Sequence, residues 1–287
     1  MTLMQDLLHR LRISAVWIAA QFVGTLLIVL AVLGWTRLPD SHGWQVAFTI
    51  LVPLLLLACL LALQAGTMRR LSGETVGRVR FFWGALSLLF WFAIVCLFWV
   101  ILDWCNDQTV VWAGYLNSRA SAGGRATVFT YDHLQSWITW VIWAIRWIAM
   151  PAKVIPWAME SARFGWRLRI GRIIRLLFNW RYWLAAIAAA VIAVVLPSHF
   201  FNGLPRGTVS HQVWAVAFKL AGAYLLAMTS WVLMLAWAAV LLARAERTTE
   251  QLIENTTGTS PVGPVQLETG SEDLTLPDAG NHVAGNS

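Results

Sequence analysis

The side chains best suited to acid–base or metal chemistry are histidines and aspartates that lie between the apolar stretches. Imidazole and carboxylate groups supply metal ligands as well as proton donors and acceptors. The set comprises His42, His133, His199, His211, Asp103, Asp107 and Asp132. Their spacings match neither His-Glu-x-x-His nor Gly-x-Ser-x-Gly, and Ser and Asp at helix starts also act as caps. The sequence therefore predicts no metal, no cofactor and no defined catalytic residue, and convergence of this set into a site stays an alternative.

A second candidate is the arginine-rich stretch at 163–181, RFGWRLRIGRIIRLLFNWR. On a helical wheel its isoleucines, Leu177 and Phe178 share one face, and Arg169, Arg172 and Arg175 share the opposite face. This pattern predicts an amphipathic helix at a membrane interface, with guanidinium groups among lipid phosphates. The candidate headgroup-binding residues are Arg163, Arg167, Arg169, Arg172, Arg175 and Arg181. The alternative is that these arginines only fix the topology and anchor the next span, and no motif for reading nucleic-acid bases accompanies them.

The third candidate is a stripe of aromatic side chains among the chain's 19 tryptophans. Trp137, Trp140, Trp143 and Trp147 fall on one side of a helix when 100° is counted for each residue. Such a stripe could line a groove for an acyl chain or another flat apolar ligand. Helix packing or contact with lipid is the alternative interpretation.

Apolar stretches of membrane-spanning length position these residues. The chain is 59% hydrophobic and 12% charged, whereas ordinary soluble domains are about 25% charged. A bilayer core requires about 20 apolar residues for each helical span. The sequence predicts an all-α, polytopic membrane protein whose bundle covers residues 1–247, with an uncleaved first span. The predicted spans are 13–35, 44–64, 81–102, 134–150, 182–196 and 213–243.

The distribution of basic residues predicts the orientation of the bundle. Cytoplasmic segments carry an excess of Lys and Arg. Six spans with a cytoplasmic N-terminus and C-terminus place most of the 21 basic residues, including all those at 163–181, on the cytoplasmic side. A five-span alternative omits 134–150 because that stretch is short and contains Arg146. We expect six spans, with Arg146 near the cytoplasmic end of the fourth.

The segment at 248–287 differs in composition from the rest of the chain. It contains Glu250, Glu254, Glu268, Glu272, Asp273 and Asp278 without any Lys or Arg. Polar, acidic stretches without an apolar pattern do not bury enough surface to fold. We therefore expect a disordered, acidic tail in the cytoplasm.

The predicted spans carry no Asp, Glu or His near their middles, which argues against an ion-coupled transporter. We expect a non-enzymatic accessory, scaffold or regulatory subunit of a bacterial cytoplasmic (inner) membrane. Its expected partners are anionic lipid headgroups and either another membrane protein or a second copy of the chain, not nucleic acid. The alternatives are a permease or channel for a neutral or lipidic solute, and a membrane enzyme acting on lipid headgroups at the outer His/Asp set.

Overall fold

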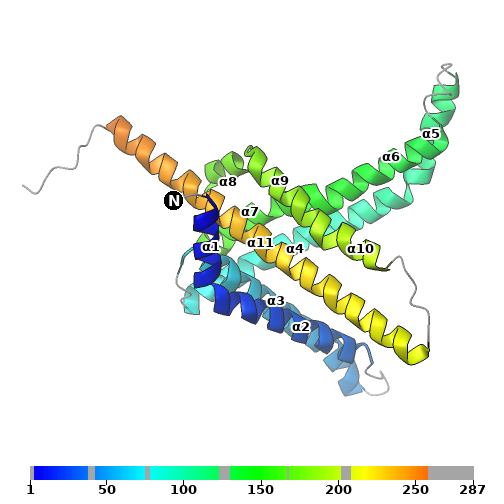
Figure 1. Cartoon of the computed structure of the whole chain (residues 1–287), viewed down its shortest axis with the longest axis horizontal. Coiled ribbons are helices and arrows are strands. Elements are labelled where there is room, and N and C mark those ends of the chain that lie inside the picture. The colour runs from blue at the N-terminus through cyan, green and yellow to red at the C-terminus, as the bar shows by residue number, and fades with distance from the viewer. Residues whose placement is uncertain are drawn as a thin grey trace, which may run out of the picture. The chain divides into compact units, whose positions relative to one another are not determined.

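The computed structural model describes residues 3–37, 43–74, 78–122, 130–166, 168–201 and 208–257 (Figure 1). Within these ranges every regular element is a helix and no strand occurs, which confirms the predicted all-α fold. The elements are α1 (Leu3–Ile13), α2 (Ala15–Trp35), α3 (Gly43–Leu71), α4 (Arg78–Asp107), α5 (Thr109–Ala122), α6 (Tyr131–Ala144), the π-helical turn η1 (Ile145–Ala149), α7 (Met150–Phe164), α8 (Ile170–Leu177), α9 (Trp180–Ala190), the π-helical turn η2 (Val191–Val195), α10 (Leu196–Phe201) and α11 (Val209–Thr257).

Six helices, some built from consecutive elements, are long and apolar enough to cross a membrane, as predicted. They are Ala15–Trp35, Trp44–Leu71, Phe82–Asp107, Tyr131–Phe164, Trp180–Phe201 and Val209–Thr248. The last of these continues as helix to Thr257, so residues 248–257 of the predicted tail are helical. The remainder of the predicted tail, 258–287, lies outside the described residues.

The helices of the fourth and fifth spans continue beyond the predicted span ends at 150 and 196, through Pro151 and Pro197. The helix from Tyr131 passes through η1 and Pro151 and ends at Phe164, and the helix from Trp180 passes through η2 and Pro197. Proline normally disrupts a helix because it lacks an N–H and clashes with the preceding turn. A π-helical turn, which changes the local hydrogen-bond pattern of a helix, ends two residues before each of these prolines.

The stretch 103–133, which separates the third and fourth predicted spans, is in large part helical. The helix α4 continues to Asp107, and α5 follows after one turn residue and packs beside α6. Arg146 also lies elsewhere than predicted. It sits 18 residues before the end of its helix at Phe164, where it forms an ion pair with Asp103 of α4 and stacks over the Trp99 ring at 5.1 Å.

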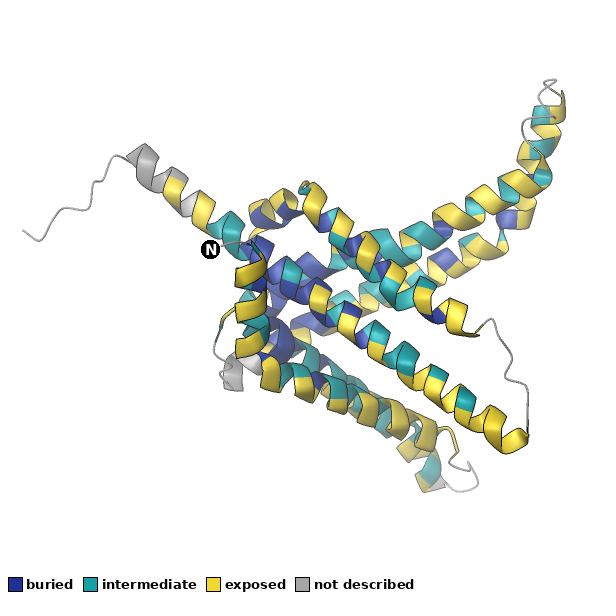
Figure 2. Ribbon diagram, in the orientation of Figure 1, coloured by how far each residue is buried: buried dark blue, intermediate teal, exposed yellow. Residues whose placement is uncertain are grey.

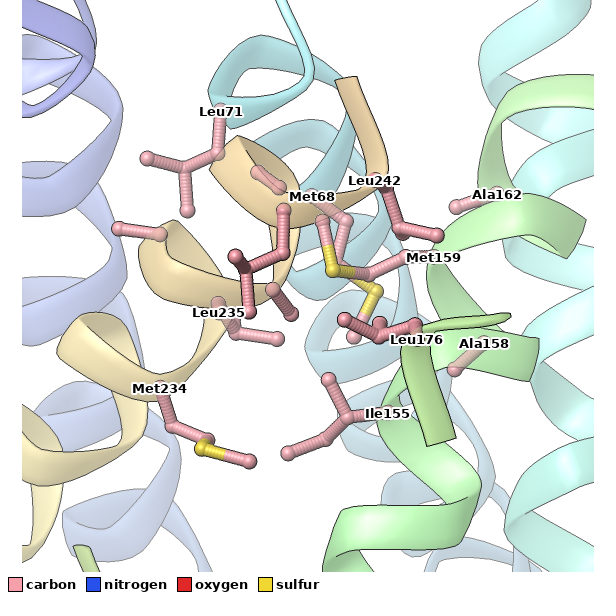
Figure 3. Close-up of a cluster of buried hydrophobic side chains, with 14 of the residues drawn as sticks. Met68, Leu71, Ile155, Ala158, Met159, Ala162, Leu176, Met234, Leu235 and Leu242 are labelled. Carbon is pink, nitrogen blue, oxygen red and sulfur yellow. The ribbon is translucent and has the colours of Figure 1, made fainter. Parts of the chain in front are cut away.

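The apolar core forms where α11 passes between α3, α7 and α8. Buried residues gather there, whereas the outer parts of most helices are exposed (Figure 2). Leu235 and Leu242 of α11 meet Met159 of α7 and Leu176 of α8 (Figure 3). Of the 18-residue apolar segment that identifies the last span, 61% is buried, whereas only 6% of the corresponding segment is buried in each of the first two spans. The helix α11 is therefore the central packing element of the described bundle.

The helices α4 and α7 approach each other closely at Gly84. A Cβ atom on Gly84 would lie 2.9 Å from the backbone oxygen of Ala162. Beside this contact, Ser87 donates a hydrogen bond to the carbonyl of Ser161 at 3.1 Å, and the Trp91 indole donates to the Ser161 hydroxyl at 2.7 Å. The missing side chain of Gly84 thus allows a pair of interhelical hydrogen bonds in apolar surroundings.

The short helix α1 is attached to α11 by an ion pair of 2.9 Å between Asp6 and Arg244. The hydrogen bond that Arg244 donates holds the pKa of the Asp6 carboxyl below its usual value. The pair therefore stabilises the folded chain above the pKa that Asp6 has when unfolded, and this contribution is lost as the pH falls through the lower folded pKa.

Asp6→Asn is accordingly expected to lower the thermal unfolding midpoint at neutral pH but not in acid. Midpoints of the detergent-solubilised wild type and variant, measured between about pH 7 and about pH 3, should converge at the acidic end of this range. Asp107→Asn, which changes an exposed carboxylate, is the matched control. A difference between wild type and Asp6→Asn that stays constant with pH would contradict the prediction.

Candidate functional site

The arginine-rich end of the bundle contains an ion-pair network that links four segments of the chain. We call the seven residues Arg69, Glu74, Glu160, Arg163, Arg169, Arg172 and Glu246 the charge network. Its centre is Glu246 of α11, whose carboxylate lies 2.9 Å from Arg172, 3.1 Å from Arg169 and 3.9 Å from Arg163. One carboxylate on the central helix thus contacts three arginines from the stretch that the sequence singled out.

The other two carboxylates extend the network to α3 and α7. Glu160 is fully buried and lies 3.5 Å from the guanidinium groups of both Arg163 and Arg172. Glu74, which follows α3, accepts a hydrogen bond of 2.9 Å from Arg163 and lies 3.3 Å from the buried Arg69. The network therefore joins the end of α3 to α7, α8 and α11.

Because much of the charge network is buried, its stability depends on the presence of every charged partner. Moving a charged group out of water costs several kcal/mol, and attraction to an opposite charge offsets that cost. Arg69, Glu160 and Arg172 are each less than a tenth exposed. The removal of one partner leaves a buried charge uncompensated, so we expect the network to fix the position of α8 against α7 and α11.

The helix within the predicted amphipathic stretch 163–181 is shorter than expected, and both an arginine and apolar residues lie on its buried side. The helix α7 ends at Phe164, Gly165 follows with a positive φ of 64°, and α8 covers only Ile170–Leu177. Positive φ favours glycine and interrupts a helix. Arg172, Ile173 and Leu176 of α8 are buried against the bundle. The buried side of α8 thus combines Arg172 from the predicted Arg face with Ile173 from the predicted apolar face.

The outer side of α8 and its flanks still combines cations with apolar side chains. We define the exposed α8 surface by seven residues, namely Arg169, Ile170, Ile174, Arg175, Phe178, Trp180 and Arg181. The side chain of Arg169 is 55% exposed although it contacts Glu246, and Phe178 is 87% exposed. Arg175 donates a hydrogen bond to the carbonyl of Ala245, and Arg181 stacks over the Trp180 ring at 5.6 Å.

Five of the six predicted headgroup-binding arginines are described; two lie in the charge network, two on the exposed α8 surface, and Arg169 belongs to both. Arg163 and Arg172 point into the charge network and are largely buried, a role that the sequence reasoning missed. Arg169, Arg175 and Arg181 belong to the exposed α8 surface, for which headgroup binding stays a prediction. Arg167 lies outside the described residues.

A groove of about 1030 Å³ borders the charge network. Its walls include Glu74, Arg163, Arg169, Trp83 and Trp166. The guanidinium carbons of Arg163 and Arg169 each lie 4.7 Å from the centre of the Phe164 ring, which also lines the groove. Cations stacked on an aromatic ring next to exposed indoles are typical of the boundary between lipid headgroups and acyl chains.

The tryptophan stripe does not form a single groove. Trp137 and Trp140 are 72% and 62% exposed. Trp140 and Trp143 line a groove of about 420 Å³ together with polar residues of α6. Trp147 instead packs edge-on against Trp99 at 5.3 Å and lines a separate apolar cavity in the bundle. The four side chains thus have different surroundings, and ligand binding by the stripe stays a prediction.

The outer His/Asp set is not brought together within the described part of the chain. His133 contacts the hydroxyl of Thr130 at 2.8 Å, and Asp103 is paired with Arg146. Among the described residues, no three or more His, Cys, Asp or Glu side chains gather as metal ligands would. His42 lies outside the described residues.

Comparisons with protein-family models, with curated proteins and with solved structures find no match to this chain. The function has to be inferred from the geometry of the arginine-rich end and of the bundle itself.

Proposed function

We propose that this chain is a non-enzymatic accessory, scaffold or regulatory subunit of a cytoplasmic membrane, and that it contacts anionic lipid headgroups through the exposed α8 surface. The observation that carries the proposal is the combination of Arg169, Arg175 and Arg181 with exposed Ile170 and Phe178 at one end of a six-span bundle. Water disfavours such apolar exposure, whereas the boundary between acyl chains and headgroups accommodates both kinds of side chain.

The attachment of α8 supports binding by a preformed surface. Arg172 and Arg163 hold the helix and its lead-in to Glu160 and Glu246, while Ile173 and Leu176 anchor it in the core. The outer arginines are thereby presented from a fixed backbone. A preformed site avoids the entropy cost of ordering a segment upon binding.

The proposed orientation has both termini and the exposed α8 surface in the cytoplasm. It rests on the excess of Lys and Arg at this end of the bundle, since the cytoplasmic leaflet carries the anionic lipids that attract basic segments. The proposal also includes a protein partner that assembles on the same surface. This partner is either another membrane protein or a second copy of the chain.

The double variant Arg175→Gln with Arg181→Gln is expected to weaken binding of anionic lipid about 30-fold, because each basic residue near an anionic surface contributes roughly 1 kcal/mol. Native mass spectrometry of the purified protein, titrated with phosphatidylglycerol and with phosphatidylcholine, measures the effect. The preference for phosphatidylglycerol in the wild type should also decline with added salt.

Arg37→Gln provides the matched control, because Arg37 is an exposed arginine at the end of α2 remote in sequence from α8. It should leave the lipid preference unchanged, and neither variant should change the thermal unfolding midpoint by more than a few degrees. Equal lipid binding by wild type, control and double variant would refute the proposed headgroup contact.

A further inference from the structure

A partly open cavity of about 250 Å³ lies between three spans. Its walls come from η1 and α7, from α9 and η2, and from α11. They include Trp147, Pro151, Ala189, Ala193 and Trp231. The cavity belongs to different helices and has a different chemistry from the exposed α8 surface.

The two π-helical turns η1 and η2 both line this cavity. The turn η1 is followed by Met150 and Pro151, and η2 is followed by Leu196 and Pro197, so each π-helical turn ends two residues before a proline. A π-helical turn widens a helix locally and is common at functional sites. Both turns contribute to the wall of the cavity, and the alanines of α9 are too small to fill the space between them.

Two polar side chains on the wall, those of Ser230 and Trp231, have hydrogen-bond acceptors within the protein. The Ser230 hydroxyl donates a hydrogen bond to the carbonyl of Ala189 at 2.7 Å, and the Trp231 indole donates to Gln64 at 3.1 Å. A buried water molecule requires two to four polar partners, whereas an apolar cavity of about 150 Å³ stays dry and binds benzene. The wall therefore favours a hydrocarbon over water.

The position of the cavity identifies the source of that hydrocarbon. All three walls belong to helices that are long and apolar enough to span a membrane. On α9, Ile187 and Ala188 are exposed beside the cavity-lining Ala186 and Ala189, so the cavity borders the lipid-facing surface of the bundle. Acyl chains of the bilayer are the apolar molecules present at this surface in highest concentration.

We infer that this cavity binds one acyl chain of a membrane lipid, held between Trp147 and Trp231 and against the alanines of α9. The bound chain fills the space left by the two π-helical turns and restores the contacts that an empty cavity lacks. The inference does not depend on the proposed headgroup contact, because no member of the exposed α8 surface lines the cavity.

Photo-crosslinking in proteoliposomes tests this inference. The full-length protein is reconstituted with a phosphatidylcholine that carries a diazirine in one acyl chain, irradiated, digested and mapped by mass spectrometry. In the wild type we expect adducts on the cavity wall of α7, α9 and α11. Ala193→Phe should abolish these adducts because its side chain occupies the cavity, whereas adducts on exposed lipid-facing residues should persist.

Ala188→Phe is the matched control, since it adds the same ring to an exposed position on α9. It should retain the cavity adducts. If Ala193→Phe does not fold, the wild-type map alone decides, because a wild type with adducts only on lipid-facing positions excludes a bound chain. Equal loss in Ala188→Phe, or undiminished labelling in Ala193→Phe, would also overturn the inference.

Discussion

Glu246→Gln is expected to lower the free energy of unfolding by about 3 kcal/mol, because removal of one partner from a buried ion pair leaves an uncompensated charge. Glu246 contacts Arg163, Arg169 and Arg172, and Arg172 is 8% exposed. After the substitution, Arg172 retains the carboxylate of Glu160 at 3.5 Å and the backbone carbonyl of Leu242 at 3.4 Å. Reversible unfolding by sodium dodecyl sulfate in mixed micelles measures the difference.

Two further variants distinguish loss of the network from loss of any carboxylate. Asp107→Asn changes an exposed aspartate and should alter stability by less than about 0.5 kcal/mol. The double variant Arg172→Met with Glu246→Leu replaces the pair by apolar side chains and should recover part of the loss, because the buried Glu160 keeps Arg163 at 3.5 Å although it loses Arg172. A Glu246→Gln protein as stable as Asp107→Asn would show that the network does not hold α8.

Gly84→Leu is expected to separate α4 from α7 and to destabilise the bundle by about 3 kcal/mol. The nearest atom to an added Cβ is the backbone oxygen of Ala162 at 2.9 Å, and a helix backbone cannot move aside as a flexible side chain can. Separation of the helices would also break the hydrogen bonds from Ser87 and Trp91 to Ser161. The thermal unfolding midpoint in detergent measures the effect.

Gly34→Leu is the control for this substitution. Gly34 lies in α2, and an added Cβ there would meet no atom within 4 Å. Because leucine has a higher helix propensity than glycine, this variant should be as stable as the wild type or slightly more stable. Equal midpoints for the variants at 84 and 34 would contradict the close approach of α4 and α7.

The six spans could be predicted from the sequence because bilayer thickness imposes a length on each apolar stretch, independent of its neighbours. The stretch Ile13–Trp35, for example, needs no tertiary information to be recognised as a span. The continuation past Pro151 and Pro197 could not be predicted in this way. The π-helical turns that precede both prolines have i→i+5 hydrogen bonds, which leave no simple pattern in the sequence.

The arrangement of the arginine-rich end could likewise be predicted only in part from the sequence. The wheel of Arg169, Arg172 and Arg175 assigned all three to one face, but the face that a cation occupies depends on carboxylates elsewhere in the chain. Glu160 stands three residues before Arg163, and this helical spacing was a local signal that could have revealed one ion pair. Glu246 lies 74 residues from Arg172, and no local spacing indicates that contact.

The central position of α11 has a consequence for the order in which the protein is made. Ribosomes deliver the spans from the N-terminus onward, so five helices enter the membrane before the helix that contributes Leu235, Val240 and Leu242 to the core is synthesised. The earlier spans are apolar enough to remain in lipid on their own, in keeping with insertion that precedes packing. Co-translational insertion therefore leaves an intermediate whose core is incomplete, and tertiary assembly is completed by the last span to emerge.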